Sequence, residues 1–182
     1  MLPRLIQKDD NGDVYESHLQ AYIVSILGKG INNILDEILL ENNKNLVWLG
    51  NEVACGVGMR KMDILYTMTQ DDQYFHYPVE LKSDYPSTDN VWQLQRYIDW
   101  LRQYYITNIP GNIIPILITY KIPNNKISRS KVYKYESDGN MSAFYSSIIN
   151  LFNDFNRKNN MRIKYVEYDV SKGGISFNEV GY

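Results

Sequence analysis

The sequence predicts an α/β fold with a mixed central β-sheet flanked by helices, and three observations support this prediction. Residues 62–68 and 74–81 are apolar, rich in strand-forming side chains, and separated by a short polar break typical of a hairpin turn. Residues 14–27 before the hairpin and 91–105 after it carry apolar side chains at helical spacing. Residues 112–120 form an apolar run without polar alternation, as in an interior strand of a mixed sheet.

The chain has 182 residues, of which 44% are hydrophobic and 22% charged, so it can build one core of ordinary globular composition. We expect a single domain over residues 1–182, with its core at about 14–120 and a C-terminal helix and strand within 141–170. Residues 1–12 are too polar for a signal peptide, and no apolar run reaches membrane-spanning length. We therefore expect an intracellular, cytoplasmic protein (in the host cell if viral) that does not bind membranes.

The composition also limits the chemistry. The single cysteine excludes an internal disulfide and a cysteine-based zinc site, and only two histidines are present. Carboxylates remain as metal ligands, which favours Mg²⁺ or Mn²⁺. The formal net charge of −2 gives no strong overall attraction to nucleic acid, so a DNA-binding surface would have to be a local basic patch.

The first predicted element is an amphipathic helix over residues 14–27. Glu16 lies in its first turn, where a carboxylate favours the helix dipole; the functional alternative is a further metal ligand. A second helical piece is expected at 31–40, followed by a short buried strand at 46–49. Residues 50–58 contain two glycines and are expected to be irregular.

The predicted hairpin brings ionisable side chains together. If its turn centres on Asp71 and Asp72, Asp63 falls opposite Glu80, and cross-strand partners have Cβ atoms about 4.5–5.5 Å apart on one face. Lys82 is two residues after Glu80 and shares its face of the strand. The hairpin therefore gathers two carboxylates and one ammonium group.

This set of side chains suits metal-assisted phosphodiester hydrolysis. Neighbouring carboxylates raise each other's pKa, and a hard divalent cation removes the repulsion. A metal held there can polarise a phosphoryl oxygen and lower the pKa of a bound water, while a lysine beside it orients that water or meets developing negative charge. The alternative is a solvated charged face, because a carboxylate two residues before a lysine arises readily by chance.

The predicted helix at 91–105 carries polar residues near its start. Gln93 and Tyr97 are four apart and share one side of the helix, with Arg96 between them. Beyond the strand at 112–120, a helix is expected at 141–155 and a last strand at 162–170, after which Gly173 and Gly174 open a tail; these bounds are taken from the apolar pattern.

Two basic segments are candidate phosphate contacts. Arg60 and Lys61 lie just before the hairpin, and their alternative role is a solvated strand entrance. Residues 121–139 are polar and form a candidate phosphate-contacting arm, with a solvated loop as the alternative. The basic residues of this arm are Lys126, Arg129, Lys131 and Lys134.

The order helix, strand, strand, strand, helix, strand resembles the PD-(D/E)XK nuclease superfamily, over about residues 16–120. Asp63 stands on the second strand and Glu80-Leu81-Lys82 on the third. With Gly58 before them and Gln93-x-x-x-Tyr97 after them, these residues are similar to the nuclease domain of NucS-like endonucleases. Archaeal Holliday-junction resolvases belong to the same wider clan.

The resemblance implies a restriction-endonuclease-like αβββαβ core and a Mg²⁺-dependent DNA endonuclease, with Mn²⁺ able to substitute. Branched or otherwise structured DNA would be its substrate. A homodimer is also implied, because small members of the clan often pair to reach both DNA strands. Alternatives are an exonuclease or a sequence-specific restriction-type nuclease of the same fold, and a non-catalytic DNA-binding module.

The resemblance also implies roles for single residues. Asp63, Glu80 and the backbone carbonyl of Leu81 would hold the metal, and Glu16 would reach it, often through water. Lys82 would position the attacking water or offset charge. Gln93 and Tyr97 would line the site. The candidate DNA contacts, taken from the basic residues themselves rather than from the resemblance, are Arg60, Lys61, Arg96, Lys126, Arg129, Lys131 and Lys134.

The sequence departs from the family in two respects. Met62 stands before Asp63, where many members have proline. NucS-like proteins carry a separate N-terminal DNA-binding domain for which these 182 residues leave no room, so mismatch specificity does not follow.

Overall fold

The computed structural model describes residues 16–29, 34–40, 44–56, 61–122, 141–171 and 174–182. The helices are α1 Glu16–Ile26, α2 Ile34–Leu39, α3 Thr88–Trp100 and α4 Met141–Asn159, and a π-helical turn, Leu101–Tyr105, extends α3. The strands are β1 Asn45–Ala54, β2 Lys61–Gln70, β3 Gln73–Leu81, β4 Gly111–Ile113, β5 Ile116–Tyr120, β6 Lys164–Ser171 and β7 Gly174–Glu179.

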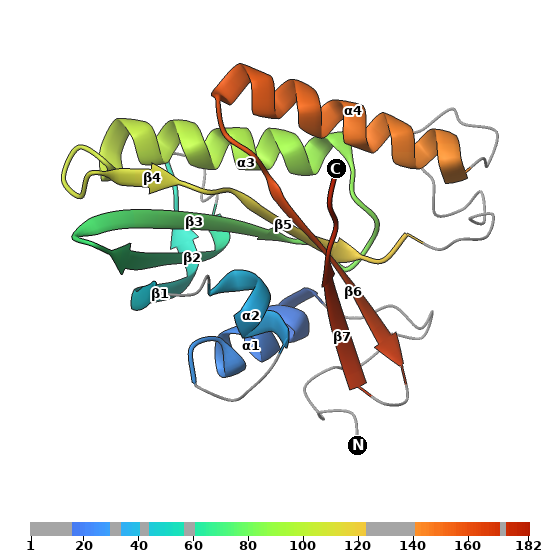
Figure 1. The fold of residues 1–182 in the computed structure, drawn as a ribbon, viewed down its shortest axis with the longest axis horizontal. Coiled ribbons are helices and arrows are strands. Elements are labelled where there is room, and N and C mark those ends of the chain that lie inside the picture. The colour runs from blue at the N-terminus through green and yellow to red at the C-terminus, as the bar shows by residue number, and fades with distance from the viewer. Residues whose placement is uncertain (1–15, 30–33, 41–43, 57–60, 123–140, 172–173) are drawn as a thin grey trace.

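The strands of the described residues form one mixed seven-stranded sheet in the order β1-β2-β3-β5-β6-β7, with β4 also pairing with β3. The first three strands are antiparallel, β3, β5 and β6 are parallel, and β7 returns antiparallel to β6. Helices α1 and α2 lie on one face of the sheet, and α3 and α4 lie on the other (Figure 1). The predicted α/β fold with a mixed sheet flanked by helices is therefore confirmed.

Each face of the sheet has its own apolar core. Leu19 and Ile23 of α1 pack with Ile64, Val79 and Leu81 on one face. The other core holds the inward side chains of α3 and α4 together with sheet residues, among them Leu94, Ile98, Phe152, Met62, Leu65 and Leu117. From Ile64 to Met68 of β2 and from Tyr77 to Leu81 of β3, the alternation of side chains thus decides which residues face α1, while Met62 departs from it and joins the core beneath α3.

The predicted hairpin is confirmed. Strands β2 and β3 pair antiparallel from Gln70 opposite Gln73 to Ile64 opposite Val79. The two turn residues, Asp71 and Asp72, have φ values of 49° and 61°. Positive φ at both central residues is the requirement of a two-residue hairpin turn of type I′, and aspartate tolerates it better than most side chains.

The expectation for residues 46–58 was wrong in two respects. Strand β1 extends through Gly50 to Ala54, so the first half of the expected irregular segment is strand. Among the described strands it is also an edge strand rather than a buried one, because β2 is its one partner there, and Val47 and Trp48 are exposed. An edge position leaves one side of the strand without a neighbour, so apolar composition alone did not guarantee burial.

Three further boundaries differ from the expectations. The strand expected at 112–120 is divided into β4 and β5, because Pro115 has no N–H to continue a ladder. The residues after Gly173 include β7, whose Phe177 is buried, so they are not a tail and β6 is not the last strand. Helix α3 begins earlier than expected, at Thr88, where the Ser87 N–H donates to the Asn90 side-chain oxygen at 2.7 Å.

Candidate active site

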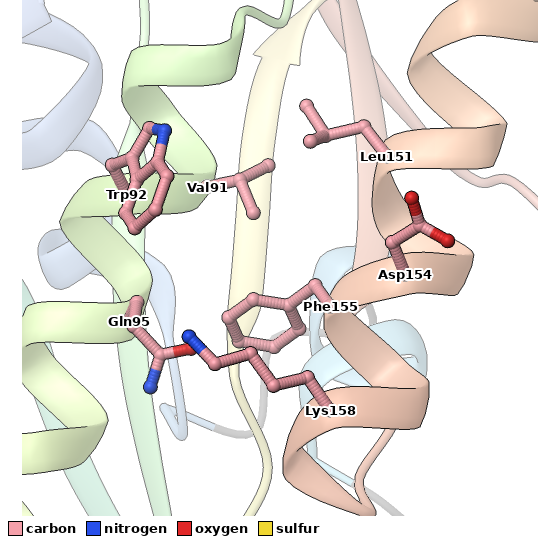
Figure 2. Close-up of a pocket in the computed structure, with 7 residues that line it drawn as sticks. All are labelled: Val91, Trp92, Gln95, Leu151, Asp154, Phe155 and Lys158. Carbon is pink, nitrogen blue, oxygen red and sulfur yellow. The ribbon is translucent and has the colours of Figure 1, made fainter.

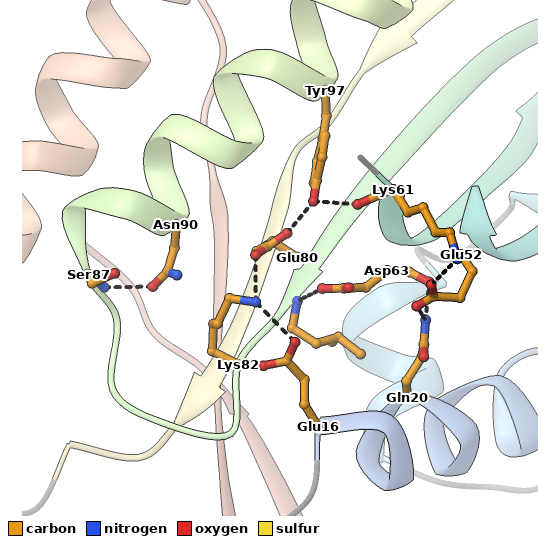
Figure 3. A network of polar contacts seen from close by, with 11 residues as sticks. Glu16, Gln20, Glu52, Lys61, Asp63, Glu80, Lys82, Ser87, Asn90 and Tyr97 are labelled. Carbon is orange, nitrogen blue, oxygen red and sulfur yellow. Dashed lines mark hydrogen bonds and ion pairs between the residues drawn. The ribbon is translucent and has the colours of Figure 1, made fainter. Parts of the chain in front are cut away.

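The register of the hairpin brings the two predicted carboxylates to the same end of the sheet. The pairing of β2 with β3 ends at Ile64 opposite Val79, and Asp63 and Glu80 are the next residues along the two strands. The carboxylate of Asp63 points toward the backbone of Leu81 on β3, and that of Glu80 contacts Tyr97 of α3 (Figure 3). The two acids thus lie on either side of the Leu81 amide.

The side chain of Asp63 takes the place of the next backbone hydrogen bond between β2 and β3. The backbone N–H of Leu81 donates to Oδ2 of Asp63 at 2.7 Å. The next N–H, that of Lys82, donates in the other direction to the Ile118 carbonyl of β5 at 2.9 Å. Because backbone groups alternate along a strand, the Leu81 carbonyl also faces the side on which Asp63 lies. This is the carbonyl that the sequence analysis named as a metal ligand.

The ammonium group of Lys82 joins two carboxylates from different parts of the chain. Its Nζ lies 2.8 Å from Oε1 of Glu80 and 3.1 Å from Oε1 of Glu16. Glu16 reaches this position from the first turn of α1 (Figure 3). Glu80 is fully buried, whereas the side chains of Lys82 and Glu16 remain partly accessible to solvent. Lys82 therefore lies between two carboxyl groups, one from β3 and one from α1.

Tyr97 of α3 holds the other oxygen of Glu80. Its hydroxyl lies 2.6 Å from Oε2 of Glu80 and 2.8 Å from the backbone carbonyl of Lys61. A phenol has one O–H proton, so it can donate a well-aligned hydrogen bond to only one of these two acceptors at a time. A proton on Glu80 would satisfy both contacts, with Glu80 donating to Tyr97 and Tyr97 donating to Lys61.

The site raises the pKa of its acids. Burial, with the Glu80 charge as the next cause, raises the pKa of Asp63 to about 7. Burial likewise raises the pKa of Glu80, although Lys82 and Tyr97 oppose the shift. Burial alone would lower the pKa of Lys82, but the charges of Glu80, Glu16 and Asp63 raise it, so Lys82 stays protonated. When all are ionised, three carboxylates against one ammonium leave excess negative charge, which a divalent cation would balance.

The donor set fits Mg²⁺, although it is not a closed cage. Within the part of the chain that the structure describes, no three His, Cys, Asp or Glu side chains are grouped as a ready-made metal site. Mg²⁺ does not need three such side chains, since it is usually bound through one or two carboxylates and keeps several waters. Asp63, Glu80 and the Leu81 carbonyl supply such hard oxygen ligands, and Glu16 could contact a metal-bound water. Binding would require Glu80 to turn from Lys82 toward the ion.

Two residues that the sequence analysis missed support this site. Gln20 lies one turn after Glu16 on α1 and is buried, and its Nε2 donates to the backbone carbonyl of Asp63 and, at 3.1 Å, to Oε1 of Glu52. Glu52 of β1 in turn pairs with Lys61 at 3.1 Å (Figure 3). The four-residue spacing of Glu16 and Gln20 was the available signal, since it places both on one side of a helix.

The predicted DNA contacts are only partly described. Lys61 is about half exposed and paired with Glu52, and Arg96 is exposed on α3. Arg96, Gln93 and Lys82 line a common hollow of about 580 Å³ beside the site. The other predicted contacts, Arg60, Lys126, Arg129, Lys131 and Lys134, lie outside the described residues.

None of the described helices is both long and apolar enough to cross a membrane. No protein-family model matches this chain, and neither a curated protein nor a solved structure shows a significant similarity to it.

Proposed function

We propose that this protein is a metal-dependent deoxyribonuclease, acting as an endonuclease, whose hydrolytic centre lies where β2 and β3 separate. The observation that carries the proposal is the meeting of Asp63, Glu80 and Lys82 at one end of the hairpin, with the Asp63 carboxylate bonded to the amide between the other two. The order α1, β1, β2, β3, α3, β5 also agrees with a restriction-endonuclease-like core.

Each residue of the site has a role in this proposal. Mg²⁺ or Mn²⁺, held by Asp63, Glu80 and the Leu81 carbonyl, would supply Lewis-acid activation of the phosphodiester and of a water. Lys82 then keeps its ammonium beside the reacting phosphate, where it stabilises negative charge on the transferred group. Glu16 holds Lys82 from the opposite side and orients the solvent at the open edge of the site.

Two further residues of α3 extend the site toward substrate. Tyr97 fixes the orientation of Glu80 through the 2.6 Å hydrogen bond. Gln93 and Arg96 lie on the hollow that adjoins Lys82, where the guanidinium of Arg96 is available for a neighbouring phosphate. A homodimer that places two such centres on the two DNA strands is part of the proposal, and light scattering of the DNA complex would test it.

The test is a cleavage assay on a panel of labelled DNAs: a linear duplex, a flap, a mismatch and a four-way junction. Each is incubated with Mg²⁺, Mn²⁺ or a chelator. We expect cleavage that requires a metal, lies within the strands rather than at free ends, and is abolished by Glu80→Gln. Gln103→Ala, a change at an exposed residue of the π-helical turn, is the matched control and should cleave normally.

Three outcomes would lead to other conclusions. Wild-type cleavage by the purified Glu80→Gln protein would refute the assignment of the site. Tight DNA binding without cleavage under either metal would instead favour a non-catalytic DNA-binding module. Stepwise shortening from free ends would favour an exonuclease on the same centre.

A further inference from the structure

An exposed tryptophan stands at the edge of the hollow beside the candidate active site. Trp92 lies on α3, and 56% of it is accessible to solvent. It lines the hollow together with Lys82, Gln93 and Arg96. The volume of about 580 Å³ lies within the range of pockets that bind small ligands or single nucleotides. The hollow is thus continuous with the centre to which we assign hydrolysis.

The core does not account for the position of this indole. The described cores include the neighbouring Val91 but not Trp92. In Figure 2, Val91 points toward α4, and Trp92 lies at the rim of the pocket that α3 and α4 form there, so its indole borders both this pocket and the hollow. Lys158 of α4 approaches the ring, with its Nζ 5.9 Å from the ring centre. Such a contact at an exposed site is weak and leaves most of the ring surface in water.

The residues around Trp92 favour a nucleic-acid ligand over an apolar one. Arg96 is four residues further along α3, so its side chain lies on the same side of the helix as the indole. An aromatic platform beside cations that track a phosphate backbone is the usual arrangement of sites for single-stranded nucleic acid. Asp89 also lines the hollow. Because an aspartate repels a phosphate, the phosphate would bind on the side of the hollow where Arg96 and Lys82 lie.

A paired base cannot use this platform. In a duplex each base is stacked between its neighbours, and its face is closed to a protein side chain. We propose that the hollow receives an unpaired nucleotide next to the scissile phosphate, with its base stacked on Trp92 and its phosphate held by Arg96. This inference rests on the proposed nuclease function and narrows the substrate to DNA with a single-stranded segment beside the cut, such as a flap or a splayed arm.

The test measures binding separately from cleavage. The full chain is titrated, in chelator, into fluorescently labelled DNAs of matched sequence: a single strand, a splayed-arm duplex and a blunt duplex. Fluorescence anisotropy gives the dissociation constants of wild type, Trp92→Ala, Trp92→Phe and the control Tyr104→Ala. Tyr104 is a suitable control because it is similarly exposed, at 55%, and does not line the hollow.

We expect Trp92→Ala to weaken binding of the single strand and the splayed arm about tenfold, which corresponds to about 1.4 kcal/mol. Binding of the blunt duplex should change less than twofold. Trp92→Phe should retain most of the affinity, since a phenyl ring can still stack, and Tyr104→Ala should match wild type. An equal loss on all three DNAs, or a loss of less than twofold on the unpaired ones, would overturn the inference.

Cleavage of the same DNAs with Mg²⁺ separates this inference from the proposed function. If no DNA is cleaved but binding depends on Trp92 as expected, the nuclease assignment fails and the site for an unpaired nucleotide remains. If all three DNAs are cleaved equally and Trp92→Ala has no effect, the nuclease assignment stands and this inference is wrong.

Discussion

The carboxylate of Asp63 accepts a hydrogen bond of 2.7 Å from the backbone N–H of Leu81, the residue between Glu80 and Lys82. This bond joins the acid of β2 directly to the triplet of β3. The N–H of Lys82 donates to β5, and the backbone groups of successive strand residues point to opposite sides. The N–H and carbonyl of Leu81 therefore point toward Asp63. One side chain therefore ends the ladder between the strands and fixes the position of a proposed metal ligand.

This bond predicts different outcomes for two substitutions of Asp63. Asp63→Asn keeps an oxygen that can accept from Leu81, so the protein should fold with near-normal stability but lose metal-dependent cleavage. Asp63→Ala should lose cleavage and also about 1–3 kcal/mol of unfolding free energy, because the Leu81 N–H loses its acceptor. Urea denaturation and the cleavage assay measure the two effects. Equal stability of the two variants would show that the bond contributes little.

The raised pKa of Asp63 predicts a pH-dependent affinity for metal. Its pKa rises from 3.8 to about 7 on folding, so between these values the metal-free folded protein binds a proton that the unfolded chain lacks. Its unfolding free energy should therefore fall as pH rises through this window, by the contribution of this group. Below pH 7, Mg²⁺ must displace this proton in order to bind. The half-saturating concentration of Mg²⁺ should therefore rise about tenfold for each unit by which the pH falls below 7.

Thermal melts with and without Mg²⁺ at pH 6 and pH 8 measure this effect. The stabilisation by Mg²⁺ should be larger at pH 8. The Asp63→Asn variant, which cannot titrate at this position, serves as the control and should lose most of the difference. A stabilisation by Mg²⁺ that is the same at both pH values in the wild type would contradict the prediction.

Local signals account for what could be predicted from the sequence. The hairpin was predictable because its turn residues and its two apolar segments agree on one register, and the register alone brings Asp63 and Glu80 to one end. Helix α3 was predictable from its apolar stripe. The spacing of Gln93 and Tyr97 showed only that they share one side of this helix, and the role of Tyr97 at the site was implied by the family resemblance. The composition of β1 could not show that it lies at the sheet edge, since that depends on which strand pairs with which.

Other features depend on contacts between distant segments. Gly50 suggested an irregular segment, yet it is part of β1, where an added Cβ would lie 2.6 Å from the Trp48 ring. The glycine leaves room for that ring, which sequence alone does not show. The bond between Gln20 and Glu52 joins residues 32 positions apart, so no local pattern indicates it.

Gln20 should act as a positioning residue. Its side chain joins α1 to the backbone of Asp63 on β2 and to Glu52 on β1, and so holds Glu16 near Lys82. We expect Gln20→Ala to cost about 1 kcal/mol of unfolding free energy, because the partly buried carbonyl of Asp63 loses its donor. Cleavage should fall mainly through a weaker response to Mg²⁺, measured as a higher half-saturating concentration. Gln103→Ala should alter neither quantity.

Tyr97→Phe tests the orientation of Glu80. The change removes the hydroxyl that lies 2.6 Å from Glu80 while keeping the ring in the core beneath α3. Hydrogen-bond partners of metal ligands typically contribute 10–100-fold to metal affinity or activity, and we expect a loss of about tenfold in Mg²⁺ affinity. Isothermal titration with Mg²⁺ would measure it. An unchanged affinity would mean that Lys82 alone orients the carboxylate.

Gly111→Ala should destabilise the sheet without affecting the chemistry. Gly111 lies on β4, opposite Tyr74 of β3, and an added Cβ would lie 2.5 Å from the Tyr74 carbonyl and 2.7 Å from His76 Nε2. The backbone cannot yield as a flexible side chain does, so we expect a cost of about 1–3 kcal/mol in unfolding free energy. The affected pairing is at the opposite end of β3 from Glu80, and cleavage well below the melting temperature should therefore persist. Gly181→Ala, where nothing lies within 4 Å of the added Cβ, is the matched control for the denaturation experiment.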